Sequence, residues 1–492
     1  MRKKLLELEQ IARRLEPTAE VRRQWNEATQ RYADAFLNQI DEAPGYEYDP
    51  DEGQGIEQWW PPQQGHPIET VLDALHRHVD HNGINPASGG HLGYIPGGGV
   101  FPAALGDYLA AVTNRYAGIY FANPGAVRME HMMLRWLSQV VGYPHSALGN
   151  LTSGGSIANL IGIVTARDAQ GIRSTEVPRS VIYLSEQVHH SVHKAIRIAG
   201  LAEAPVRFVP LDKHYRLDAQ ALAQMVQHDE AQGLRPFLVI ASAGTTDTGA
   251  IDPLEAIARI AQAHHMWFHI DAAYGGFFIL LDELKAQFKG IAQSDSLAID
   301  PHKGLFLPYG IGAVLVKNGQ ALMKSHYYQA NYMQDALANA HQLSPADLSP
   351  ELTKHFRALR LWLPLQLLGL EPFIAALKEK RLLALYFHRQ VQQLGFEVGP
   401  EPDLSVVIYR YRPPRGDANE WNRQLAQLIQ RDGRVFISST TINGQVWLRL
   451  ACLSFRTHLN HIDTLLDMLQ KGVRILTEER TAHAPTKTKH SS

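Results

Sequence analysis

Six short apolar segments between residues 181 and 316 alternate with helical stretches, and this alternation is what most limits the folds open to the chain. The segments expected to form strands are residues 181–184, 206–209, 237–241, 266–270, 296–299 and 312–316. Strands that alternate with helices are typical of a mostly parallel sheet covered by helices. We therefore predict an α/β fold for the region from about residue 85 to residue 370.

Single charged residues follow two of these strands. Asp271 follows strand 266–270, and Lys303 lies just past strand 296–299, between His302 and a glycine. Open α/β sheets bind ligands at the carboxyl ends of their strands. A lysine in so apolar a setting suits an amine that must lose its proton to attack a carbonyl. A helix cap for the aspartate and a solvated surface position for the lysine are the structural alternatives.

A turn of small residues supplies a third group. Gly154 and Gly155 allow a tight turn, Ser156 offers a hydroxyl, and a helical run begins soon after. Free N–H groups at the start of a helix attract anions, and phosphate is the expected ligand. The turn is not a Walker loop, because no lysine follows the glycines. An ordinary helix start made of small residues is the alternative.

Polar residues also follow two further strands. His189 and His190 come after strand 181–184, and Thr246 lies on a glycine-flanked turn after strand 237–241. The alternative for the histidines is the solvent-facing start of a helix. Taken together, the five segments offer a lysine for an imine, an aspartate for a protonated ring nitrogen, a phosphate site and a histidine that could cover a ring face. These are the groups that pyridoxal 5′-phosphate requires.

In these five segments the sequence resembles the group II pyridoxal-phosphate-dependent amino acid decarboxylases, which include aromatic amino acid, glutamate and histidine decarboxylases. The matching motifs, all in the family's order, are Ser153-Gly-Gly-Ser156, His189-His-Ser-Val192, Gly244-Thr-Thr246, His269-Ile-Asp-Ala-Ala-Tyr274 and Asp300-Pro-His-Lys303. The similarity extends from about Trp59 to about Asp463. It implies the fold-type-I PLP-dependent transferase fold, with a mostly parallel sheet in a large domain and a smaller α+β C-terminal domain.

The resemblance also implies a role for each matched residue. Lys303 would form the internal aldimine, Asp271 would keep the pyridine nitrogen protonated, and His189 would stack on the ring and act with them in catalysis. The implied cofactor contacts are Gly155, Ser156, His189, Thr246, Asp271, Ala273, His302 and Lys303. The implied substrate contacts are Tyr94, Pro96, Gly97 and Arg449. For Arg449, a purely structural ion pair is the alternative.

The implied reaction is decarboxylation of an L-amino acid to the amine and carbon dioxide, which requires an acid to return a proton to Cα. In much of the family a loop tyrosine is that acid, but the corresponding region from Asp335 to Ser349 contains no tyrosine. Tyr332 just before it, His341 or water could take the role. Loss of the acid diverts some relatives to aldehyde formation by oxidative deamination, so that reaction stays open, as does another carbon–carbon lyase activity.

Aromatic residues near the expected pocket favour an aromatic substrate, with an acidic or small amino acid as the alternative. These residues are Tyr94, Tyr120, Phe121 and Tyr332.

The alternative to an enzyme is a scaffold protein that binds no cofactor. The intact set of lysine, aspartate, histidine and serine residues argues against that alternative. The histidine spacings do not match a zinc protease, so we expect no catalytic metal.

Composition agrees with a soluble enzyme. Apolar residues make up 45% of the 492 residues. The formal net charge is −2, so the sequence has no excess of basic residues that would indicate binding to nucleic acid. The single cysteine, Cys452, is expected to be a small core residue. We see no signal peptide and no run long enough to span a membrane, and we expect a cytoplasmic location.

Four regions are expected along the chain. Residues 1–84 form a helical segment that, in the family, lies across the partner subunit, so a homodimer is expected. Residues 85–375 form the large cofactor domain, residues 376–480 the small α+β domain, and residues 481–492 a polar, disordered tail.

Overall fold

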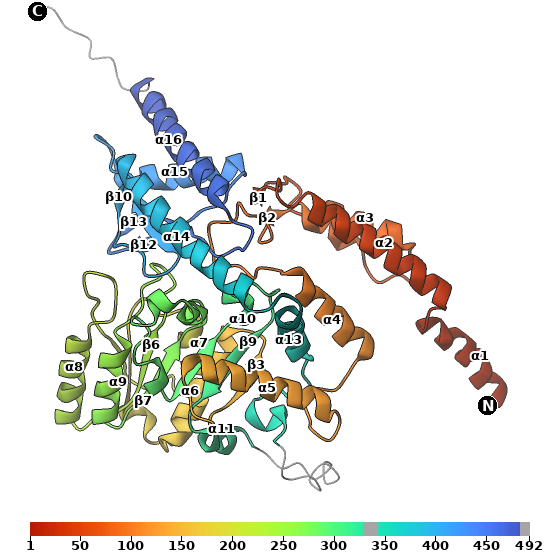
Figure 1. Cartoon of the computed structure of the whole chain (residues 1–492), viewed down its shortest axis with the longest axis horizontal. Helices are drawn as coiled ribbons and strands as arrows, with labels where there is room; N and C mark the ends of the chain where they lie inside the picture. Colours follow the sequence, from red (N-terminus) through yellow and green to blue (C-terminus); the bar gives the residue numbers. More distant parts are fainter. Residues whose placement is uncertain (328–342, 483–492) are drawn as a thin grey trace, which may run out of the picture.

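The structure is a computed structural model, and it describes residues 1–327 and 343–482 (Figure 1). Tyr332 and His341, the two side chains considered above as proton donors, lie outside the described residues. Figure 1 shows a large body built around a sheet, a smaller unit beside it, and a helical N-terminal segment that extends away from both.

The body is built on a seven-stranded sheet with the strand order β3-β9-β8-β7-β6-β4-β5. Its strands are β3 (Leu148–Thr152), β4 (Ser180–Leu184), β5 (Val206–Phe208), β6 (Arg235–Ser242), β7 (Trp267–Asp271), β8 (Ser296–Ile299) and β9 (Gly312–Val316). Strands β5, β4, β6, β7 and β8 run parallel, whereas β9 is antiparallel to β8 and β3 is antiparallel to β9. The six predicted strands and the mostly parallel sheet are confirmed. Strand β3 was not predicted, because its sequence Leu-Gly-Asn-Leu-Thr lacks a clear apolar pattern.

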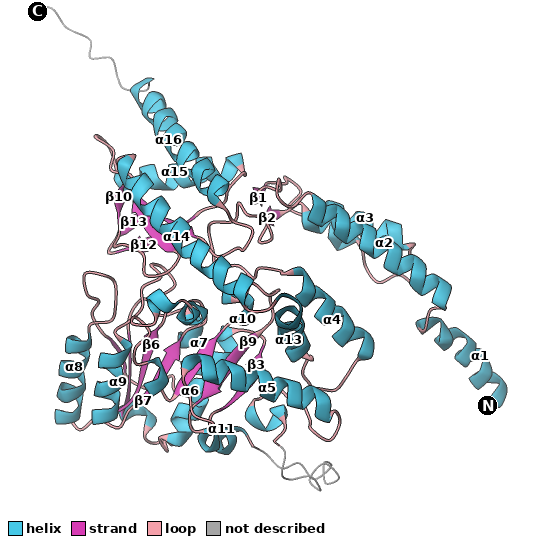
Figure 2. Cartoon of the chain, in the orientation of Figure 1, coloured by secondary structure: helices cyan, strands magenta, loops and turns pink. Residues whose placement is uncertain are grey.

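Helices cover both faces of this sheet (Figure 2). They include α6 (Gly155–Ala169), α7 (His190–Ile198), α8 (Ala219–Ala231) and α9 (Leu254–Ala263). Val181 and Tyr183 of β4 share a core cluster with residues of α8 and α9, whereas Ile182 and Leu184 share another with residues of α6 and α7. Successive side chains of a strand point to opposite faces, so β4 is buried on both sides. This explains its unbroken apolar sequence.

A four-stranded antiparallel sheet lies in the C-terminal part of the chain, with the order β10-β11-β13-β12. Its strands are β10 (Glu397–Val398), β11 (Val406–Arg410), β12 (Ser438–Ile442) and β13 (Gln445–Ala451), and the helices beside it are α14 (Glu371–Gln393), α15 (Ala418–Asp432) and α16 (Leu459–Ala482). The strands predicted near 405–409 and 446–450 are confirmed. Cys452 is fully buried in the core of this unit, as expected.

The predicted domain boundaries stay predictions. Helix α14 runs without a break past residues 375 and 376, and α16 runs past residue 480. The remaining α-helices of the described residues are α1 (Arg2–Ala12), α2 (Ala19–Asn38), α3 (Ile68–Leu75), α4 (Phe101–Thr113), α5 (Pro124–Val141), α10 (Pro301–Gly304), α11 (Gly319–His326) and α13 (Arg357–Leu368). Within the described residues, no single helix has the length and apolarity to cross a bilayer; α13 and α14, bent by 93° at their junction, meet the test only as a pair.

Candidate active site

A cavity of about 310 Å³ lies where strands β4, β6, β7 and β8 end and helix α6 begins. Its lining consists of Ser153, Gly154, Gly155, Ser156, Asn159, His189, Ser191, Ser242, Gly244, Thr246, Asp271, Ala273, Tyr274, Asp300, His302 and Lys303. All eight residues predicted to contact the cofactor are among them. Their sequence positions are far apart, but parallel strands bring their carboxyl ends to one edge of the sheet.

Lys303 lies on the short helix α10, which begins just after β8. Its Nζ is 3.2 Å from Oδ2 of Asp300, a carboxylate that is buried at the end of the same strand. The other oxygen of Asp300, Oδ1, has no hydrogen-bond partner among the described residues. His302 Nδ1 donates to the Ile311 carbonyl oxygen at 2.6 Å, and burial lowers the pKa of His302. The cavity therefore holds one primary amine beside a buried carboxylate.

Asp271 is the last residue of β7 and is held by two donors. Its Oδ2 accepts from Asn159 Nδ2 at 2.9 Å, and its Oδ1 accepts from the Ala273 backbone N–H at 3.1 Å. Behind it, Asn159 Oδ1 is 3.0 Å from His269 Nε2, and His269 Nδ1 is 2.7 Å from Ser296 Oγ. Burial lowers the pKa of His269 to about 4, so this histidine is neutral and donates through Nε2. Asp271 is thus a fixed carboxylate, suited to hold a protonated ring nitrogen.

His189 caps the N-terminus of α7 with its ring. Its Nδ1 accepts from the Ser191 backbone N–H at 3.2 Å and lies 2.8 Å from Ser191 Oγ. A ring nitrogen that accepts an amide proton carries none of its own, so neutral His189 bears its proton on Nε2. Burial is the main cause that lowers the pKa of His189 and favours this neutral form. The ring therefore offers the cavity an uncharged, flat surface.

The small-residue turn leads from β3 into α6 and leaves space for an anion. The backbone of Gly154 has φ 154°, and a Cβ at Gly155 would come within 3.0 Å of the Ala273 side chain and of Asp300 Oδ2. Gly155 and Ser156 begin α6, whose first N–H groups have no partner inside the helix. Those groups, the Ser156 hydroxyl and His302 form a donor set that fits a phosphate.

The predicted substrate residues do not line the cavity itself. Tyr94 is half exposed, and the Gly97 backbone packs on Tyr309, whose ring lies 5.9 Å from that of His302. Arg449 is buried, and its guanidinium donates to the carbonyl oxygens of Gly93, Thr246 and Asp247 and to Ser438 Oγ. Most of its donors are therefore already used. Arg449 ties the segment before Tyr94 to the Thr246 turn at the cavity.

Sequence reasoning missed several lining residues, above all Asn159 and Asp300. Asp300 stands in the motif Asp300-Pro-His-Lys303 without a role assigned to it, and Asn159 lies three residues beyond the motif Ser153-Gly-Gly-Ser156. Asn159 lies four residues after Gly155 on α6, and residues at this spacing share one face of a helix. That spacing could have placed Asn159 at the cavity. For Asp300, its position at the end of a buried strand is the same signal that identified Asp271.

Comparison with known proteins agrees with this geometry. Residues 61–412 match the family model of the pyridoxal-dependent decarboxylase conserved domain. An aromatic-L-amino-acid decarboxylase of Bacillus atrophaeus is 32% identical over 435 residues, covering 86% of this chain and 88% of that protein. Tryptophan decarboxylase 2 of Oryza sativa is 28% identical, covering 83% and 85% of the two chains.

A crystal structure of Oryza sativa TDC with PLP and tryptamine superimposes with a TM-score of 0.88 at 25% identity, covering 94% of this chain and 99% of that one. The fold-type-I architecture is therefore confirmed. The lysine, the aspartate and the phosphate-sized turn that share the cavity fit pyridoxal 5′-phosphate, the cofactor of this family. The chain therefore belongs to the pyridoxal-dependent decarboxylase family and is a PLP-dependent amino acid decarboxylase.

Proposed function

We propose that this protein removes the carboxyl group of an aromatic L-amino acid and releases the amine and carbon dioxide. The observation that carries the proposal is the single cavity in which Lys303, Asp271 and His189 meet the Gly154–Ser156 turn. Pyridoxal phosphate, when bound there, supplies the electron sink for the pair of electrons left when carbon dioxide departs.

The side chains divide the remaining tasks. Lys303 would bind the cofactor's aldehyde carbon, and Asp300 would hold the lysine's proton when the amine is free, because their atoms lie 3.2 Å apart. Asp271 would keep a proton on the ring nitrogen, since a carboxylate beside a base favours its charged form. His189, neutral and flat, would cover one face of the ring and orient the substrate carboxylate. Tyr332, His341 or water stays the predicted source of the Cα proton.

An aromatic cluster around Tyr94 supports the choice of substrate. The ring of Phe436 lies 5.6 Å from that of Tyr94 and 5.9 Å from that of His91. Arg449 links this cluster to the cavity, because it binds both Gly93 and Thr246. Aromatic rings favour one another through offset or edge-on contacts. The names of the aromatic amino acid and tryptophan decarboxylases described above support the same choice.

Two other reactions have support of their own. An L-2,4-diaminobutyrate decarboxylase of Acinetobacter baumannii is 30% identical over 398 residues, which favours a small substrate with a charge. A phenylacetaldehyde synthase of Arabidopsis thaliana is 26% identical over 430 residues, and the absence of a tyrosine from the sequence 335–349 favours aldehyde formation.

One experiment separates these activities. The purified protein with PLP is incubated with a panel of L-amino acids, and carbon dioxide, amine, hydrogen peroxide and ammonia are measured. Equal amounts of carbon dioxide and amine, from aromatic substrates above all, are expected. Peroxide and ammonia would instead assign aldehyde formation, and preference for diaminobutyrate would refute the aromatic substrate. The Lys303→Ala variant is the control, and its remaining activity should be negligible. Borohydride reduction of the unmodified protein should attach the cofactor to Lys303 and to no other lysine.

We also propose that the protein is a homodimer. Leu5, Leu8, Ile11 and Leu15 of the first helical segment are all more than half exposed, and no residue of α1 is buried within the described chain. Apolar side chains at helical spacing favour burial against another surface. Light scattering after gel filtration should give twice the chain mass. Replacing Leu5 and Leu8 by serine should lower that mass, and a monomer at all concentrations would refute the proposal. The predicted cytoplasmic location stays a prediction.

A further inference from the structure

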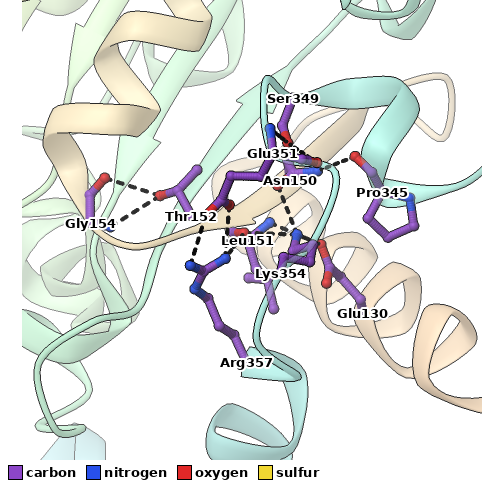
Figure 3. Close-up of polar contacts among 10 residues, drawn as sticks. All are labelled: Glu130, Asn150, Leu151, Thr152, Gly154, Pro345, Ser349, Glu351, Lys354 and Arg357. Atoms are coloured by element: carbon purple, nitrogen blue, oxygen red, sulfur yellow. Dashed lines mark hydrogen bonds and ion pairs between the residues drawn. The ribbon is translucent and has the colours of Figure 1, made fainter. Parts of the chain in front are cut away.

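The strand that leads into the phosphate turn has one edge without a partner strand. Within the described residues, β3 is hydrogen-bonded to β9 alone. In an antiparallel pair, alternate residues direct their N–H and C=O groups away from the partner strand. At Leu151 those two groups are bound by side chains. The N–H donates to Glu130 Oε1 at 3.1 Å, and the carbonyl oxygen accepts from Lys354 Nζ at 2.9 Å (Figure 3).

Lys354 lies at the centre of this arrangement. Its side chain is fully buried, and its ammonium group donates to Glu130 Oε1 at 2.7 Å, Asn150 Oδ1 at 2.8 Å and the Leu151 carbonyl oxygen at 2.9 Å. An ammonium group has three N–H donors, so each of them has an acceptor. Burying an ion pair is costly, and such a pair persists only where its geometry and hydrogen bonds are good. Lys354 and Glu130 therefore hold one defined position of the strand.

Other contacts join the same strand to the segment that carries Lys354. Asn150 Nδ2 donates to the Pro345 carbonyl oxygen at 2.7 Å, and Arg357 Nη1 lies 3.4 Å from the Leu151 carbonyl oxygen. Arg357 is itself held by the carboxylate of Glu351. Figure 3 shows that these side chains converge on β3 from α5 and from the segment that leads into α13.

The cofactor turn begins one residue after the end of β3. Thr152 Oγ1 donates to the Gly154 carbonyl oxygen at 3.0 Å and accepts from the Gly154 N–H at 3.3 Å (Figure 3). Any shift of Leu151 along the sheet edge is thus passed through Thr152 to Gly154 and Gly155. The cavity has little room for such a shift, because Gly155 lies close to Ala273 and Asp300.

We propose that Lys354 is a positioning residue for the cofactor's phosphate: by clamping the open edge of β3 at Leu151, it sets the position of the Ser153–Ser156 turn. Lys354 does not line the cavity, so this role is exerted through the strand. An apolar residue in its place would leave the Asn150 amide oxygen buried without a donor. The Leu151 carbonyl would keep only the 3.4 Å contact with Arg357, and the buried Glu130 carboxylate would keep only the Leu151 N–H. The turn would then lose the support that keeps its N–H groups in place.

A second buried lysine provides a matched control. Lys380 on α14 is also fully buried. Its Nζ donates to the Thr457 carbonyl oxygen and lies 2.9 Å from Glu379 Oε2. It belongs to the C-terminal unit, and it contacts neither β3 nor the turn in the part of the chain that the structure describes. Replacing either lysine by methionine removes a buried charge of the same kind. Only Lys354→Met should change the phosphate site.

The test compares two ligands that differ only in the phosphate. The full-length protein is stripped of cofactor, and binding of pyridoxal phosphate and of pyridoxal is titrated by visible absorbance. Lys354→Met should weaken pyridoxal phosphate binding by about tenfold or more, the effect of roughly one charged hydrogen bond, and leave pyridoxal binding unchanged. Lys380→Met should change neither affinity, even where it lowers the melting temperature as much. Lys354→Arg should restore part of the loss, because it keeps the charge and the donors.

Equal weakening of both ligands by Lys354→Met, or no weakening of either, would overturn the proposal and leave Lys354 a general stabiliser. Where Lys354→Met does not fold, Glu130→Gln replaces it in the test. That variant keeps the shape of the side chain and removes its charge, and it should show a smaller loss that is still restricted to pyridoxal phosphate. A Glu130→Gln variant with unchanged affinity for pyridoxal phosphate would overturn the proposal equally.

Discussion

The buried amide of Asn159 allows a quantitative test of how the Asp271 carboxylate is held. Asn159 is 1% exposed, donates to Asp271 Oδ2 at 2.9 Å and accepts from His269 Nε2 at 3.0 Å. Asn159→Ala removes a hydrogen bond to a charged group, worth about 1.5–3 kcal/mol, and leaves the His269 N–H buried without an acceptor at a cost of about 1–3 kcal/mol. We expect the free energy of unfolding of the cofactor-free protein to fall by about 3–5 kcal/mol.

Asn419 is the matched control for this variant. Its amide makes two hydrogen bonds, to the Gly444 carbonyl oxygen and from the Val446 N–H, both at 2.9 Å, but it lies near the surface of the C-terminal unit. Because both partners are neutral and water can replace the amide, Asn419→Ala should cost about 1 kcal/mol. Urea unfolding of the two variants, followed by circular dichroism at one pH, gives the comparison. Equal midpoints for Asn159→Ala and Asn419→Ala would refute the view that Asn159 holds a buried charge.

Three further predictions follow from the packing. A Cβ at Gly162 would lie 2.6 Å from His269 Cε1, so Gly162→Ala should cost about 1–3 kcal/mol of stability, whereas Gly125→Ala, with its nearest atom at 3.5 Å, should not destabilise the protein in the same urea assay. Burial lowers the pKa of His91 to about 4, so the unfolded chain binds a proton near pH 6.5 that the folded chain does not bind. Stability should therefore fall as the pH drops below about 6.5, by about 2 kcal/mol at pH 5, and His91→Gln should show a smaller fall; identical slopes for the two proteins would contradict this. Arg449→Lys should raise KM for an aromatic substrate, since a lysine cannot reach Gly93 and Thr246 together; an unaltered KM would show that the link does not matter for substrate binding.

Much of the large sheet and its ligand edge could be predicted from the sequence. The strands 181–184 and 237–241 are buried on both faces, so they appear as short, unbroken apolar runs between helical stretches. Asp271 ends such a strand, and Lys303 and His189 follow within five residues of the ends of theirs; parallel strands bring those ends together. Asp271, Lys303 and His189 could therefore be assigned to one site without knowledge of the contacts between them.

The second layer of contacts was not predictable in this way. The side-chain donor to Asp271 comes from α6, and the donor to the Leu151 carbonyl comes from a segment about two hundred residues away in sequence. Strand β3, with its glycine and its asparagine, carries a weak local pattern, and its place at the sheet edge depends on pairing with β9. Arg449 was expected to meet a substrate, but the structure engages it with carbonyl groups of two loops.

Local sequence patterns determined where strands and helices form and which polar residues stand at the strand ends, because side-chain periodicity and turn chemistry act over a few residues. The tertiary structure alone decided which buried donor meets which buried acceptor. That pairing depends on how segments distant in sequence pack together. A buried polar group forms a hydrogen bond with the partner that this packing places beside it.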